Sequence, residues 1–296
     1  MRISYNDFIH PQDDAARRQL EAVPGFDTVT KCYLKFGVEK FIHGYFMANY
    51  IRLSQTQLPE IYGLLPPVVE KFGLSEPEFY LQMNPTPNAY TMGDSQCFIV
   101  LTSGLLEHIT DRKELEAVIA HECGHIACRH VFYRTMASLL TMVGSAIGIP
   151  SALAAPIELA FNYWSRRSEL SADRAAAVYL GDPKSMVGSL LRLSGGPSQF
   201  TANINIAEYA DQAKAYYALQ SESKWHKLLQ TCAVMNRSHP FSAVRIQELQ
   251  NWCDTDKYKT LCKNWQEGLC MVRCKKCGGD VFPRDRFCCH CGAPIE

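Results

Sequence analysis

The five residues His121-Glu122-Cys123-Gly124-His125 form an H-E-x-x-H pattern, which joins two metal-ligand side chains to an acid–base group. Helical residues four positions apart lie one above the other on the same face, so both imidazoles can reach one zinc ion. Glu122 would project beside the metal, where its carboxylate can accept a proton from the attacking water. Cys123 would point away. The pattern predicts a catalytic zinc site, which the surrounding sequence must support.

The residues around this motif predict the helix that it requires. Asp111 and Glu114 form an Asp-x-x-Glu helix start of the capping-box kind. The apolar residues that follow recur at helical spacing as far as Arg129, namely Leu115, Val118, Ile119 and Ile126. The alternative is a charged helix with two solvated or core histidines. Two histidines and a glutamate in an apolar helix would, however, need polar partners.

A catalytic zinc ion needs a third protein ligand and an open fourth position. The segment from Trp164 to Leu180 predicts a second helix, and Glu169 and Asp173 lie four residues apart on one of its faces. One carboxylate could bind the metal while the other holds a ligating imidazole by a hydrogen bond. Both could equally be surface carboxylates that pair with Arg166 and Arg174. The spacing alone leaves both interpretations open.

These motifs together resemble the HtpX-like zinc metallopeptidases, the family that also contains the CAAX prenyl-protein proteases. The similarity runs from about Leu58 to about Leu249, and it includes Asn88-Ala89, the run Leu101 to Leu106, Ser238-His239-Pro240 and Arg245-Ile246. The resemblance implies that Glu169 is the third ligand and that Asp173 supports it. It also implies that His239 lies near the site, to stabilise the oxyanion or to occupy the open zinc position. A histidine before proline could instead simply end a loop.

The resemblance implies an α+β, mainly α-helical fold with a small β-sheet beside the zinc helix. The sequence supports three strands independently: Phe79, Leu81 and Met83 alternate, 88–92 is short and extended, and 97–102 is rich in β-branched and aromatic residues. A turn at 93–95 would join the last two. An edge strand at Asn88 and Ala89 could bind an extended polypeptide substrate by main-chain hydrogen bonds. The strands could also only cover the helix.

Two C-x-x-C pairs near the C-terminus predict a second metal site. They are Cys274, Cys277, Cys288 and Cys291, each pair is followed by glycine, and ten residues separate the pairs. This spacing is typical of a zinc ribbon, in which four thiolates hold a structural zinc ion. Cys289 or His290 could replace one ligand, although each breaks the spacing. A redox role is a poorer explanation, since a tail too small for its own core usually depends on a metal.

Composition restricts partners and location. The 30 basic and 30 acidic residues give a net charge of zero, which argues against nucleic acid as the main partner. Residues 1–19 carry no apolar segment of the signal-peptide kind, and the scattered cysteines suit a reducing compartment, so we expect a cytoplasmic protein. The uncharged segment 135–157 is long enough to cross a bilayer. It is interrupted by glycine and proline, and His125 must meet Glu169 on one side. We therefore expect a buried or peripherally attached hairpin, with no transmembrane span.

The sequence thus predicts four parts: a helical extension at 1–55 that packs on the core, a peptidase domain at 56–253, a polar linker at 254–271 and a zinc ribbon at 272–296. The expected function is a zinc metalloendopeptidase with one catalytic and one structural Zn²⁺, acting on unfolded or membrane-associated polypeptides. The alternative is a non-catalytic adaptor that acts through its ribbon. Glu122 favours the enzyme, because an adaptor would have no use for the general base.

Overall fold

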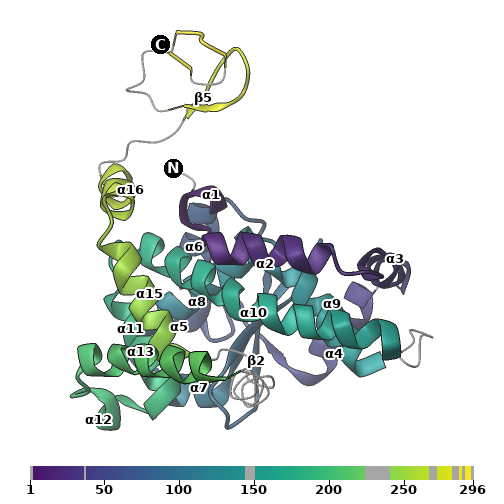
Figure 1. The fold of residues 1–296 in the computed structure, drawn as a ribbon, viewed down its shortest axis with the longest axis horizontal. Coiled ribbons are helices and arrows are strands. Elements are labelled where there is room, and N and C mark those ends of the chain that lie inside the picture. Colours follow the sequence, from purple (N-terminus) through teal and green to yellow (C-terminus); the bar gives the residue numbers. More distant parts are fainter. Residues whose placement is uncertain are drawn as a thin grey trace.

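A computed structural model describes residues 3–36, 38–143, 151–223, 241–266, 272–281, 287–288 and 291–294. The protein is mainly helical, with a small sheet at its centre (Figure 1). The N-terminal helices are α1 (Tyr5–Phe8), α2 (Pro11–Glu21), α3 (Phe26–Phe36) and α4 (Val38–Asn49), followed by α5 (Pro59–Tyr62) and α6 (Leu65–Phe72). The central helices are α7 (Ser103–His108), α8 (Arg112–Ala127), α9 (His130–Val143) and α10 (Ser151–Leu180). The later helices are α11 (Lys184–Gly195), α12 (Ser198–Thr201), α13 (Ile206–Glu222), α15 (Ser242–Cys253) and α16 (Asp256–Gln266). The predicted α+β, mainly α-helical class is confirmed.

The sheet contains four strands, β1 (Ile51–Arg52), β2 (Glu78–Gln82), β3 (Ala89–Gly93) and β4 (Cys97–Thr102), in the spatial order β1-β2-β4-β3. Strand β4 runs parallel to β2 and antiparallel to β3, with Tyr90 opposite Val100. The last three strands agree with the prediction to within about one residue at each end, because alternation in the first of them and the β-branched and aromatic run in the last are local signals. Strand β3 lies at one edge of the sheet, as predicted.

The sheet separates two apolar cores, and β4 supplies both. Its side chains alternate, so that Ile99 and Leu101 join the core beneath α6, α8 and α11, whereas Phe98 and Val100 join the core beneath α2, α4 and α9. All four side chains are fully buried. A central strand buried on both faces explains the continuous apolar run in the sequence, and it gives the neighbouring helices a rigid support.

Helices α8 and α10 carry the predicted metal ligands and pack closely against each other. Helix α8 begins as predicted, since the Asp111 side chain accepts hydrogen bonds from the backbone of Lys113 and Glu114. The Glu114 carboxylate, however, pairs with Arg192 of α11. Helix α10 ends as predicted before Gly181, which has φ +80°, but it begins at Ser151, well before the predicted start. The apolar residues that were expected to form a separate hairpin arm extend this helix.

The uncharged segment 135–157 is divided between α9 and the first turns of α10, and residues 144–150 lie outside the described part. Met136 and Leu140 of α9 and Ile157 of α10 are buried in the core beneath α2 and α4. Over the part of the chain that the structure describes, no helix is both long enough and apolar enough to span a bilayer.

The prediction of a polar linker at 254–271 is wrong for most of these residues. Residues Asp256–Gln266 form α16, in which Tyr258 and Cys262 are buried in the same core as α8. The Tyr258 hydroxyl donates a hydrogen bond of 3.2 Å to the carbonyl of Ala177 on α10. Tyr258, Leu261 and Cys262 form an apolar stripe at helical spacing, which the polar composition of this segment concealed. Only 267–271 remain for a linker, and they lie outside the described residues.

The N-terminal extension takes part in the main fold more deeply than predicted. Its last residues form β1, which pairs with β2, and α2 lies along α10 (Figure 1). Helices α3 and α4 together carry an aromatic-rich face. Tyr33, Ile42 and Phe46 of this face are buried. Phe41 and Tyr45 are instead exposed at the rim of a cavity, which is described below.

Candidate metal centre and active site

The three predicted ligands of the catalytic metal converge on one point. His121 Nε2 lies 3.1 Å from His125 Nε2, and the Glu169 carboxylate oxygens lie 3.4 Å from each of these nitrogens. A tetrahedral zinc ion with bonds of about 2.0–2.1 Å spaces its ligand atoms roughly 3.3–3.4 Å apart. The donor set and its spacing therefore fit a zinc ion, with three protein ligands and one open position.

Each ligand is placed by the packing of α8 on α10. His121 and His125 lie on the buried face of α8, and Glu169 faces them from α10; all three side chains are at most 3% exposed. The two helices approach closely at Gly124, where a Cβ atom would lie 2.5 Å from the Cβ of Ala175. This glycine allows the carboxylate of α10 to reach the imidazoles of α8.

Asp173 holds His121 from the side opposite the metal position. Its Oδ1 lies 3.0 Å from His121 Nδ1, and Arg245 of α15 donates to both of its oxygens, at 2.8 and 2.6 Å. Burial raises the pKa of Asp173, but the charge and hydrogen bonds of Arg245 outweigh it and lower the pKa. Burial also opposes a charge on His121, yet its bonds to Asp173 and Glu169 raise its pKa to about 9, so a metal that binds here must displace a proton from His121. Asp173 thus supports an imidazole ligand, as the spacing allowed.

Glu169 is surrounded by positive side chains as well as by the two imidazoles. Arg134 of α9 pairs with its Oε1, and Arg245 lies 3.1 Å from its Oε2. Burial and the nearby charge of Arg134 together hold the pKa of His125 well below its ordinary value. A neutral His125 is the form that a metal requires. Neither arginine was predicted as a site residue, although Arg245 is among the residues that carry the family resemblance.

Glu122 is buried, at 1% exposure, next to His121. Together with His121, Ala89 of β3 and Arg245 it borders a cavity of about 10 Å³. That is about the room that one water molecule occupies. The predicted general base, a metal ligand and the first residue of the edge strand therefore meet at a space of the size of one water.

A second, larger cavity of about 580 Å³ lies along the other side of β3. Asn88, Tyr90 and Met92 border it from the strand, and Arg134 borders it from α9. Side chains of α4 and α10 complete its mainly apolar lining, among them Phe41, Ile42, Tyr45, Phe46, Phe161 and Trp164. Because Arg134 also pairs with Glu169, a single side chain connects the cavity to the metal centre.

The profile of peptidase family M48 matches residues 57–253, about two thirds of the chain. The chain belongs to peptidase family M48. It is 33% identical over 264 residues to the plastoglobule-localized metallopeptidase 48, chloroplastic, of Arabidopsis thaliana, covering 87% of this chain and 75% of the relative. It is 26% identical over 238 residues to a protease HtpX homolog of Ralstonia nicotianae, covering 72% and 80%. It is 28% identical over 170 residues to protease HtpX homolog 2 of Methanosarcina mazei, covering 48% and 58%.

These matches confirm the resemblance to HtpX-like metallopeptidases, and this M48 protein is a metalloprotease. The structure brings together His121, Glu122, His125, Glu169 and Asp173. Ala89 borders the small cavity beside Glu122, whereas Asn88 borders the larger cavity. His239 lies outside the described residues, so its place near the site stays a prediction.

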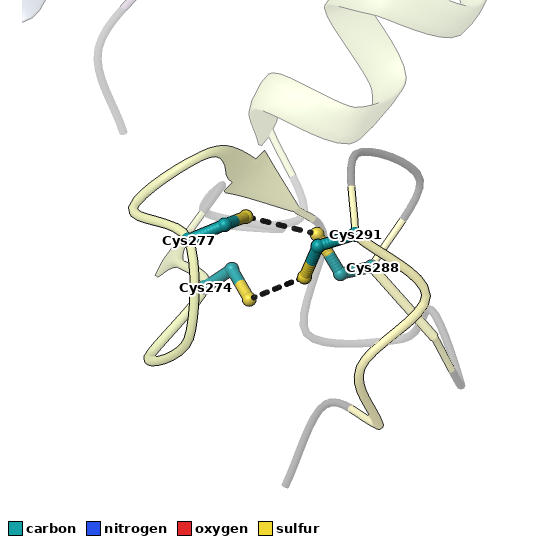
Figure 2. A group of neighbouring side chains, drawn as sticks. All are labelled: Cys274, Cys277, Cys288 and Cys291. Carbon is teal, nitrogen blue, oxygen red and sulfur yellow. Dashed lines mark hydrogen bonds between the residues drawn. The ribbon is translucent and has the colours of Figure 1, made fainter.

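The four cysteines of the predicted ribbon converge on a second metal position beyond the M48 match. Figure 2 shows the sulfur atoms of two opposed loops pointing toward one another. Cys274 lies 3.7 Å from Cys291 and Cys277 lies 3.6 Å from Cys288, measured between sulfur atoms. A tetrahedral zinc ion with Zn–S bonds of about 2.3 Å spaces its sulfur atoms roughly 3.8 Å apart. The four thiols fit a structural zinc ion.

The described residues of the two loops make matching backbone hydrogen bonds. In each, a glycine in the left-handed region, Gly278 or Gly292, donates its N–H to the carbonyl of the first cysteine at 2.8 Å. The backbone N–H groups of Cys277 and Lys276 lower the pKa of the Cys274 thiol to about 6, which favours the thiolate. A two-stranded ribbon, β5 (Val272–Arg273) and β6 (Asp280–Val281), carries the first loop. Cys289 and His290, the alternative ligands, lie outside the described residues.

Proposed function

We propose that this M48 protein is a zinc-dependent metalloendopeptidase in which His121, His125 and Glu169 bind the metal. The observation that carries the proposal is the spacing of 3.1–3.4 Å among the three ligand atoms, with the Glu122 carboxylate beside them. When bound, a zinc ion polarises the attacking water and the scissile carbonyl. The protein groups around it do the rest of the chemistry.

Glu122 accepts the proton of the attacking water and returns it to the nitrogen of the departing amine. In this proposal the attacking water lies between the metal position and Glu122, which borders the small cavity beside His121. Asp173 fixes His121 through Nδ1, so that Nε2 faces the metal. The open fourth position is where the water or substrate carbonyl binds, and His239 is the residue that we expect to stabilise the oxyanion or to occupy this position at rest.

An extended polypeptide fits the edge of the sheet. Strand β3 lies at the edge, and its first residue, Ala89, borders the same small cavity as Glu122. A substrate strand added along β3 would place alternate side chains toward the larger cavity beside Asn88 and Tyr90. The apolar lining of this cavity suits a large apolar side chain. Segments of this kind are exposed in unfolded or membrane-associated proteins.

The deciding experiment compares Glu122→Gln with wild type in the cleavage of casein and of a fluorogenic peptide. Glutamine has the size of glutamate but cannot accept the proton, so the variant should keep its zinc and lose about 10²–10⁴-fold in turnover. Glu107→Gln, which changes an exposed glutamate outside the site, is the matched control and should cleave like wild type. Wild-type turnover by Glu122→Gln at equal zinc content would contradict the assignment.

The ribbon is, in our proposal, a structural zinc module that recruits substrates or partners. An adaptor without catalysis is the competing function, and the same Glu122→Gln experiment separates the two, because an adaptor would show no zinc-dependent cleavage in the wild type. Nucleic acid is not an expected partner. A cytoplasmic location, with peripheral membrane contact, stays our prediction; the Arabidopsis relative is named for its plastoglobule location.

A further inference from the structure

The second metal ligand, His125, contacts a chain of buried groups that leads away from the metal. Its Nδ1 lies 2.8 Å from Nδ1 of His130 on α9. On the far side of His130, Nε2 lies 2.9 Å from Oδ2 of Asp13 on α2. His130 and Asp13 are both only 1% exposed. Asp13 lies outside the residues that match the M48 profile.

Only one arrangement of protons satisfies the hydrogen bonds among His125, His130 and Asp13 when a metal is bound. His125 faces the metal through Nε2, so a neutral His125 carries its proton on Nδ1. That proton is donated to His130 Nδ1, which must therefore lack one. The proton of His130 then resides on Nε2 and is donated to Asp13. Each nitrogen of the two imidazoles then makes one contact, and the series of hydrogen bonds ends at the Asp13 carboxylate.

Asp13 is held in place by further donors. Trp164 Nε1 donates to its Oδ1 at 3.0 Å, and Ser171 Oγ donates to its Oδ2 at 2.5 Å. Burial raises the pKa of Asp13, but its contacts with His130 and with these two donors outweigh it and lower the pKa. Because Asp13 accepts three hydrogen bonds, its side chain is a carboxylate, and it faces the metal ligand through one imidazole.

We infer that Asp13 and His130 are positioning residues for the catalytic metal, which fix the orientation and tautomer of His125 through a His125–His130–Asp13 relay. The two metal imidazoles then have equivalent support: His121 directly from Asp173, and His125 through His130 from Asp13. The inference rests on the proposed metal site. It makes the N-terminal helix α2 part of the active site.

The test measures zinc affinity at the His/His/Glu site in Asp13→Asn, in His130→Gln and in the double variant. Each protein keeps its ribbon, whose thiolate–cobalt absorption serves as an internal reference when Co²⁺ replaces zinc. Either single change should weaken metal binding by about 10–100-fold, as removal of a ligand's hydrogen-bond partner does, and shift the cobalt bands of the His/His/Glu site. The double variant should be no worse than the single ones, because all three break the same relay.

Two controls separate positioning from simple folding. Asp14→Asn changes the neighbouring carboxylate, which pairs with Arg17 and Arg18 at the surface, and should bind zinc like wild type. Trp164→Phe removes the donor to the other oxygen of Asp13 and part of a buried ring that contacts His130, and it should lower the unfolding temperature without a tenfold loss of zinc affinity. If Asp13→Asn binds zinc as tightly as wild type and leaves the cobalt bands unchanged, the inference is wrong.

A measurement on the unmutated protein covers the case in which the variants do not fold. Imidazole ¹⁵N shifts of the zinc-loaded wild type should show His125 protonated at Nδ1 and His130 protonated at Nε2. A His130 protonated at Nδ1 would overturn the relay. The proposed peptidase activity would be rejected by a different result, namely a His125→Ala variant that retains zinc in the His/His/Glu site, or a Glu122→Gln variant that is active. The two ideas can therefore be rejected separately.

Discussion

Replacing Gly124 by alanine should disturb the metal site without touching a ligand. Gly124 lies between Glu122 and His125 on α8, at a point where α8 packs closely on α10. A Cβ atom there would lie 2.5 Å from the Cβ of Ala175, whereas ordinary contact begins at about 3.4 Å. Both helices are buried at this point, so they must separate by roughly 0.9 Å.

The size of the effect follows from two comparisons. Zinc sites tolerate about ±0.2 Å in their bond lengths, and Glu169 is carried by the helix that would move, so we expect at least a tenfold loss of zinc affinity. Overpacking costs about 1–3 kcal/mol, whereas alanine is favoured over glycine in a helix by about 1 kcal/mol. The net loss of unfolding free energy should therefore be small, up to about 2 kcal/mol.

The assay combines urea unfolding with zinc titration of Gly124→Ala, Ala175→Gly and the double variant. Ala175→Gly removes the atom that the new Cβ would meet, so the double variant should regain most of the zinc affinity. Ala175→Gly alone should cost about 1 kcal/mol in stability through helix propensity and leave zinc binding nearly unchanged. Wild-type zinc affinity in Gly124→Ala, or no rescue in the double variant, would refute the idea that this contact sets the ligand spacing.

Four further predictions concern the two metal sites and the cavity. Purified protein should contain two zinc ions, and replacing both His121 and His125 by alanine should leave one, which metal analysis would detect; a strong chelator should empty the open site first. Asp173→Asn should lose about 10–100-fold in zinc affinity or peptide turnover; a wild-type value in both would exclude its support of His121. Ser138→Phe, which adds a ring to the lining of the large cavity, should slow cleavage of peptides with large apolar residues more than of peptides with small ones; equal slowing of both would argue against a role in substrate binding. Truncation after Gln266, which retains α16, should preserve zinc in the His/His/Glu site and small-peptide hydrolysis; a truncated form that holds this zinc but cleaves nothing would place the ribbon within the active enzyme.

Local patterns were sufficient for the parts of the site that lie within one element. The H-E-x-x-H helix, the strands and the cysteine pairs each have a signature within a few residues, set by helical spacing, alternation or ligand spacing. Glu169 needed the family resemblance, because the same spacing is equally typical of a surface carboxylate. The polar composition of 256–266 concealed an apolar stripe of only a few residues, and α10 continues through Pro156, a residue type that usually ends or kinks a helix.

The contacts that hold the ligands could not be predicted, because each joins elements far apart in the sequence. Arg245 lies 72 residues from Asp173, and Asp13 lies 117 residues from His130. An arginine or aspartate on a helix carries no local sign that it will be buried. Its role appears only when packing brings it to an imidazole or a carboxylate with which it can form a hydrogen bond or an ion pair.

The relay that we infer would give the N-terminal extension a role in orienting a metal ligand. The residues that match the M48 profile supply all three candidate ligands and the general base, yet one of the two imidazoles is supported by a carboxylate from outside that range. Helix α2 is held on α10 through Ser171, which also accepts a hydrogen bond from the backbone of His10 at 3.0 Å. The buried contact between Ser171 and Asp13 therefore both holds α2 on α10 and belongs to the groups that orient His125. A change that loosens α2 would reach the metal through His130 even though it removes no ligand.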